Sequence, residues 1–129
     1  MTLQELADRQ AVADLVDGLG LWLDEKRFDA AHEILTADVR VQTPGGVAEG
    51  IERVAAQAAR NHAVPTQHVI TNVRVALGGD RATAGANLVV TFAGDRLRTL
   101  GERYRFEAVR RPEGWRLSSI RVEPVWVKE

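Results

Sequence analysis

Residues 67–77 read Gln67-His68-Val69-Ile70-Thr71-Asn72-Val73-Arg74-Val75-Ala76-Leu77, a pattern of alternating apolar side chains that predicts a β-strand. Side chains alternate between the two faces of a strand, so His68, Ile70 and Asn72 are expected on one face. If that face points into the protein, an imidazole and an amide are buried there, and each needs a hydrogen-bond partner or a ligand. The stretch therefore predicts a polar site inside the fold.

Three further long strands are predicted after this one, at Arg81–Ala93, Arg96–Val109 and Trp115–Trp126. The turns between the strands are short and rich in glycine, aspartate and proline, so consecutive strands are expected to pair as antiparallel neighbours. The strand at 81–93 places small alanines beside Leu88 on the face expected to point inward. Small side chains in mid-strand leave space, which predicts a cavity against a curved sheet.

The first half of the chain carries helical signals. Thr2 and Glu5 have the spacing of a capping box, and apolar residues then recur every three or four positions until about Asp24. A second helix is predicted at Phe28–Leu35 and a third from Ile51 to about His62. Helices that precede a long antiparallel meander predict an α+β fold, with a curved antiparallel sheet packed against three N-terminal helices.

A small hairpin is predicted between the second and third helices, with a strand at Val39–Thr43 and a turn at Pro44-Gly45-Gly46. No linker, repeat or low-complexity segment interrupts the chain. We therefore expect a single domain over residues 1–129.

Composition argues against several classes of chemistry and binding partner. The 129 residues include no cysteine and have a formal net charge of −1, which disfavours thiolate chemistry and a nucleic-acid partner. The arginines of the late strands are interpreted as one solvated or partner-facing sheet surface. The N-terminus shows no signal-peptide pattern and no apolar run has the length of a membrane helix, so we expect a soluble, cytoplasmic protein without membrane contact.

Several short stretches resemble the SnoaL-like branch of the nuclear-transport-factor-2-like superfamily, across nearly the whole chain. They are Asp8–Leu15, Leu23-Asp24 with Arg27–Ala30, Leu35–Val39, Gly50-Ile51, Gln67–Val73, Gly101–Tyr104 and Gly114–Leu117. The resemblance implies a cone-shaped α+β barrel, a homodimer formed through the sheet, and a pocket for a hydrophobic small molecule between sheet and helices. The activities it implies are polyketide cyclisation, dehydration, ketosteroid isomerisation and epoxide hydrolysis.

The resemblance also implies catalytic roles for Asp24 and His68. They match an acidic residue late in the first helix and a histidine at the start of the sheet in dehydratase-like and cyclase-like members. One group would remove a proton next to a carbonyl of a hydrophobic, oxygenated substrate, and the other would donate one. Burial is expected to raise the pKa of Asp24 toward a usable range. The function implied is that of an isomerase, cyclase or lyase.

Further residues are expected to bind the substrate. Asn72 and Tyr104 would donate hydrogen bonds to a developing oxyanion, and Trp22, Leu88 and Phe106 would form the pocket wall. His, Asp and Glu show no metal-ligand spacing, so neither a metal nor a cofactor is expected. The strand after His68 carries Asn87 where dehydratase-like members have a second histidine, which favours isomerisation or cyclisation over dehydration.

Each site residue also has a structural interpretation. Asp24 would cap a helix end or pair with Arg27, and His68 would be a core histidine bonded to a neighbouring helix. The chain would then be a non-catalytic ligand-binding or protein-assembly module, or a subunit whose arginine-bearing sheet face supports another protein. An exposed, salt-bridged Asp24 would favour these alternatives.

Overall fold

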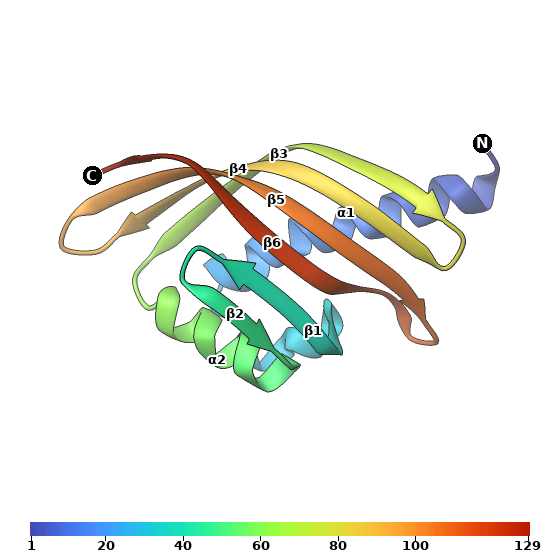
Figure 1. The fold of residues 1–129 in the computed structure, drawn as a ribbon, viewed down its shortest axis with the longest axis horizontal. Helices are drawn as coiled ribbons and strands as arrows, with labels where there is room; N and C mark the ends of the chain where they lie inside the picture. Colours follow the sequence, from blue (N-terminus) through green and yellow to red (C-terminus); the bar gives the residue numbers. More distant parts are fainter.

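Six strands form one curved sheet in the spatial order β2-β1-β6-β5-β4-β3. The computed structural model describes all residues 1–129, and Figure 1 shows the sheet arching over the helices. The elements are α1 (Leu3–Asp24), the 3₁₀ helix η1 (Phe28–Glu33), β1 (Leu35–Thr43), β2 (Gly46–Glu49), α2 (Ile51–Asn61), β3 (Thr66–Gly78), β4 (Arg81–Ala93), β5 (Leu97–Arg111) and β6 (Gly114–Lys128). The predicted α+β class is confirmed.

The sheet is mixed rather than fully antiparallel, which corrects the predicted topology. The meander from β3 to β6 is antiparallel, as its short turns require. Strand β1, however, pairs with β6 in parallel, with Val41 opposite Ile120. A short turn makes strands antiparallel only when it joins them directly. Strands β1 and β6 are far apart in the chain, so no turn sets their relative direction.

Helix α1 begins as predicted. The Thr2 hydroxyl accepts a hydrogen bond from the Glu5 backbone N–H at 3.0 Å, which caps the first turn. The buried stripe of α1 packs mainly on β3. No helix of the chain combines the length and the apolar character needed to cross a membrane.

The second predicted helix is shorter than expected, because β1 begins at Leu35 instead of Val39. Leu35 already pairs with Leu117 of β6, and the Leu117 backbone N–H donates to the Ile34 carbonyl at 2.8 Å. Pairing with the sheet therefore ends the helical segment. Helix α2 matches its prediction to within one residue.

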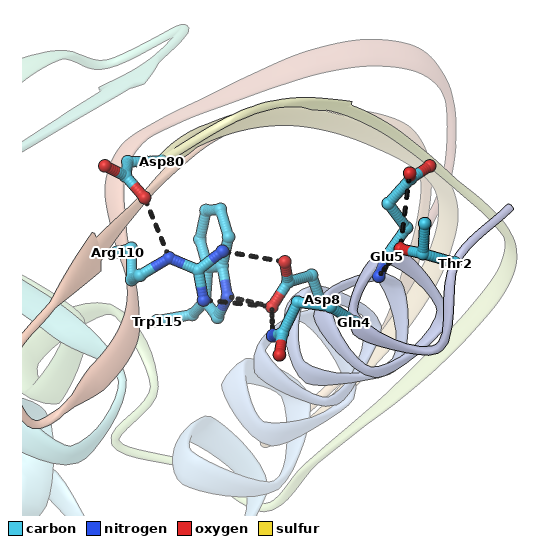
Figure 2. A network of polar contacts seen from close by, with 7 residues as sticks. All are labelled: Thr2, Gln4, Glu5, Asp8, Asp80, Arg110 and Trp115. Atoms are coloured by element: carbon cyan, nitrogen blue, oxygen red, sulfur yellow. Dashed lines mark hydrogen bonds and ion pairs between the residues drawn. The ribbon is translucent and has the colours of Figure 1, made fainter.

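A buried carboxylate fastens the first turns of α1 to the far end of the sheet (Figure 2). Asp8 is 7% exposed and accepts hydrogen bonds from both Arg110 terminal nitrogens, at 3.0 and 2.7 Å, and from the Trp115 indole at 3.2 Å. Bonds from Arg110 outweigh desolvation and hold the pKa of Asp8 down, to about 2. Arg110 also pairs with Asp80, in the β3–β4 turn, at 2.9 Å. The main cavity lies at the opposite end of α1, where Leu19, Trp22 and Leu23 line it.

Candidate functional site

Asp24 and His68, 44 residues apart in the chain, are brought into direct contact. Asp24 is the last residue of α1, and His68 is the third residue of β3, the strand on which α1 packs. His68 Nδ1 lies 2.6 Å from Asp24 Oδ1, and the His68 backbone N–H donates to Oδ2 at 2.7 Å. The Thr66 hydroxyl adds a third bond, to Oδ1, at 2.9 Å. Both carboxylate oxygens are therefore occupied by β3.

This contact fixes the tautomer of His68. An ionised carboxylate only accepts hydrogen bonds, so Nδ1 carries the hydrogen and Nε2 presents a lone pair. Nε2 has no hydrogen-bond partner in the chain. The fully buried side-chain atoms that lack a partner belong to Arg9, Trp22 and Thr36, so Nε2 is not one of them. His68 lines the main cavity with a side chain that is only 2% exposed, and its Nε2 is an acceptor without a partner in the chain.

Both ionisable groups have a pKa below the ordinary value, and for Asp24 this differs from the expectation. Burial alone would raise the pKa of Asp24, but the hydrogen bonds from the His68 backbone and imidazole and from Thr66 outweigh it and leave the pKa below its ordinary value. The expectation of a raised Asp24 pKa was therefore wrong. Burial lowers the pKa of His68 more than Asp24 raises it. At neutral pH the pair is a carboxylate and a neutral imidazole.

The cavity beside this pair has a volume of about 1020 Å³. It lies between the helices and the concave side of the sheet, and most of its wall is apolar. Three residues predicted as substrate contacts line it: Trp22, Leu88 and Tyr104. Burial raises the pKa of Tyr104, so its hydroxyl stays protonated and is a hydrogen-bond donor. Asp24 is not part of the wall, and its side chain is 19% exposed, against 2% for His68.

Two residues predicted as substrate contacts lie outside the cavity wall. Phe106 is 3% exposed, lies in the core with its ring 4.9 Å from that of Tyr104, and does not line the cavity. Asn72 is exposed and has a left-handed backbone, with φ of 59°. The pairing of β3 with β4 shifts register between Thr71 and Arg74, which marks a β-bulge at Asn72.

The bulge has a clear physical reason. Unbroken alternation from His68 would bury Arg74, whereas one extra residue turns Arg74 outward and Val73, Val75 and Leu77 inward. The sequence indicated this β-bulge, because the inward apolar residues fall on even positions up to Ile70 and on odd positions from Val73 onward. Asn tolerates a positive φ better than a β-branched residue does.

His62 is a site residue that the sequence did not reveal. It follows α2, yet its ring lies 5.4 Å from the ring of His68 and 5.6 Å from that of Phe92, and it lines the cavity. Its Nδ1 is 2.8 Å from the Ala58 carbonyl, which only accepts, so Nε2 again has a lone pair. Burial lowers the pKa of His62 as well. Two neutral imidazoles thus stand side by side.

Lys26 is a second residue missed from the sequence. It follows α1 with a left-handed backbone, at φ of 58°, and its ammonium donates to the Val64 carbonyl at 2.8 Å and to the Thr66 hydroxyl at 3.1 Å. It thereby fixes the segment that leads into β3. Arg27 pairs with Glu33 and not with Asp24, so the expected alternative of an Asp24–Arg27 pair was wrong.

No three His, Cys, Asp or Glu side chains converge as a metal site would require. The cavity wall offers lone pairs at His62 and His68 and a hydrogen-bond donor at Tyr104, which suit acid–base chemistry. Its other polar side chains include Gln57, Asn61, Arg96, Arg98 and Glu102.

Comparisons with known proteins agree with this architecture. The family model described as a SnoaL-like domain matches residues 4–121. The uncharacterized protein Rv2910c of Mycobacterium tuberculosis is 30% identical over an alignment of 129 positions, which covers 91% of this chain and 85% of the relative. A hexachlorocyclohexane dehydrochlorinase, LinA type 2, superposes with a TM-score of 0.89 at 21% identity, covering 98% of this chain and 90% of its own.

A candidate scytalone dehydratase of Novosphingobium aromaticivorans also superposes with a TM-score of 0.89, at 15% identity, covering 99% of this chain and 91% of its own. At these identities the two solved structures establish a shared fold. The family model covers most of the chain, and the mycobacterial relative is 30% identical over 85% of its own length. The chain therefore belongs to the SnoaL-like family of the nuclear-transport-factor-2-like superfamily.

Proposed function

We propose that the cavity is the active site of a cofactor-free lyase or isomerase, in which His68 removes a proton from carbon in a hydrophobic, oxygenated substrate. The observation that carries the proposal is the imidazole of His68, which is bound to Asp24 at Nδ1, has no partner at Nε2 and belongs to the wall of a largely apolar cavity. A neutral histidine is a suitable general base near neutral pH. Two proteins of the same fold have names that denote eliminations, a dehydrochlorinase and a candidate dehydratase, which supports a lyase.

Asp24 acts in this mechanism through His68. It holds the imidazole in the tautomer with a bare Nε2, and its negative charge lies 2.6 Å from the ring that becomes positive when the proton is taken. Because both its oxygens are occupied and it does not line the cavity, we assign Asp24 as a positioning residue.

Tyr104 is the proposed oxyanion donor. Its protonated hydroxyl belongs to the cavity wall, where it can stabilise the negative charge that forms on a carbonyl oxygen as the neighbouring carbon loses its proton. His62, which directly follows α2, places a second imidazole beside His68, in place of the one that the strand after His68 lacks. This contact removes the reason for disfavouring dehydration.

The proposal is tested with 5-nitrobenzisoxazole, an apolar probe that reacts with a base in one step. The base takes the proton from carbon, the N–O bond breaks, and a coloured nitrophenolate is released. His68→Asn is the informative variant, because its amide can keep a donor near the position of Nδ1 while Nε2 is removed. We expect the rate to fall by roughly 100-fold or more.

Asp14→Asn serves as the matched control, since Asp14 is exposed on the same helix as Asp24 and bonds only to Gln10. It should react at the wild-type rate. Saturable binding of the probe with no His68-dependent reaction would refute the enzyme and favour the non-catalytic ligand-binding module.

A further inference from the structure

The outer face of the sheet carries a row of arginines that the proposed function does not use. Arg105 lies between two buried aromatic residues of β5, so its own side chain points away from the core. Strand register places Arg105 opposite Gly85 of β4 on one side and Arg121 of β6 on the other. Gly85 is in turn opposite Arg74 of β3. Three exposed arginines therefore form one row across β3, β4, β5 and β6, interrupted only by a glycine.

A hollow of about 830 Å³ lies over this row, and Arg74, Gly85, Arg105 and Arg121 all line it. Glycine is unfavourable inside a strand, where it often marks a point at which a ligand or another backbone comes close. A Cβ at position 85 would lie 3.7 Å from Nη1 of Arg105, so this guanidinium sits over the glycine. The hollow thus has a floor of bare backbone with a cationic group above it.

The arginines of this row are not neutralised by the chain itself. Arg105 donates from Nε to Glu123 at 2.8 Å, and its Nη1, over Gly85, is not used in this ion pair. Arg74 and Arg121 belong to no ion pair, although Arg121 lies directly opposite Arg105. Like charges directly opposite each other destabilise a pair of strands. An anion bound over the row would remove this repulsion.

The other charged residues of the hollow are Arg40, Glu107 and Glu123. Arg40 pairs with Glu49 at 3.4 Å, and Glu123 is held by the arginine row itself. Glu107 is exposed, belongs to no ion pair and lies one row away from the arginines. Two unpaired guanidinium groups therefore face one unpaired carboxylate, which leaves the hollow with an excess of positive charge.

We propose that this hollow binds the phosphate group of a small organic phosphate ester, with the phosphate above Gly85. Guanidinium groups bind phosphate through paired hydrogen bonds. Arg74 and Arg105 flank the glycine, one from each neighbouring strand, and Arg121 adds a positive charge one strand further. A phosphate dianion matches the two arginines that the chain leaves unpaired. The hollow is much larger than a phosphate ion, which favours an ester over the free ion.

A homodimer through the sheet, which the family resemblance implies, would cover this outer face. A bound phosphate group is compatible with such a pair, because it neutralises arginines that pairing removes from water. Charges that are buried without a partner are costly. The proposed site therefore does not require the face to be free of a second copy, and it does not depend on the chemistry of the main cavity.

The experiment measures Kd by isothermal titration calorimetry at about pH 8, where a phosphate monoester is a dianion. Glycerol 3-phosphate and inorganic phosphate are titrated at one ionic strength, so that charge screening is the same throughout. Arg74→Gln and Arg121→Gln should each weaken the binding of glycerol 3-phosphate by roughly 10-fold. Arg81→Gln is the matched control, since it removes an exposed arginine of β4 that does not line the hollow, and it should bind as the wild type does.

Glu107→Gln tests the site with a change of opposite sign. Removing this carboxylate from the hollow should tighten the binding of glycerol 3-phosphate by roughly 2- to 3-fold, because the carboxylate repels the ligand. The altered side chains are exposed, so the fold should be kept, and a melting curve of each variant checks this.

Two results would overturn the site: no saturable binding of either compound by the wild type, or equal affinity in the wild type, Arg74→Gln and Arg121→Gln. Inorganic phosphate that binds as tightly as glycerol 3-phosphate would overturn the choice of an ester and assign the free ion to the hollow.

Discussion

Asp24→Asn is the perturbation whose outcome the structure determines most closely. Asp24 accepts three hydrogen bonds, two at Oδ1 and one at Oδ2, and asparagine offers only one acceptor oxygen. Its NH₂ group must therefore face one of two donors. If it faces the His68 backbone N–H, two donors oppose each other and the fold loses about 1–3 kcal/mol, the cost of an unsatisfied buried group.

If the NH₂ group faces the imidazole instead, Nδ1 must become the acceptor and the hydrogen moves to Nε2. The Thr66 hydroxyl can rotate to accept, so this arrangement costs little stability. It removes the lone pair that takes the substrate proton, however. Loss of the correct tautomer in a comparable triad costs on the order of 10⁴ in kcat.

The assay measures kcat and KM for 5-nitrobenzisoxazole together with the free energy of unfolding in urea. We expect kcat to fall steeply while KM changes little, because Asp24 does not line the cavity. Asp14→Asn on the same helix should match the wild type in both measurements. A variant Asp24→Asn with wild-type kcat and wild-type stability would refute the assignment of Asp24 as the positioning residue.

Three further predictions follow from the fold. Asp8→Asn should lower the Tm at neutral pH, measured by calorimetry. The difference in Tm from the wild type should shrink as pH falls from 3.8 to about 2, because protonation of Asp8 in the folded protein ends its ion pair with Arg110. Asn72→Val should destabilise the fold by about 1–2 kcal/mol in urea while Asn72→Gly does not, and both should keep benzisoxazole turnover, since the positive φ and not the amide is required. We also propose that the outer sheet face pairs two copies of the chain, and sedimentation velocity should show a dimer at micromolar concentration; a monomer would contradict the pairing.

Periodicity in the sequence was sufficient to predict the main elements of the fold. The capping box of α1, the α2 helix and the four long strands depend on local patterns, and each lies within a few residues of its expected bounds. The parallel pairing of β1 with β6 was not predictable in this way, because it joins strands that are remote in the chain and have no shared turn to set their direction.

The candidate site was predictable only in part, for the same reason. Asp24 and His68 meet because α1 packs along β3, and family resemblance pointed to both positions. Asn72 was misplaced because the β-bulge changes which residues face inward. His62 gave no local signal, because only the tertiary fold brings its ring beside that of His68 in the cavity wall.

The most direct test of the central claim is nitrogen NMR of histidine-labelled protein across a pH titration, with the His68 signals assigned by their loss in His68→Asn. The account predicts a neutral ring with the hydrogen on Nδ1, a bare Nε2, and a pKa below 6.5. A His68 that carries its hydrogen on Nε2 at neutral pH, or one that is already protonated there, would contradict the account.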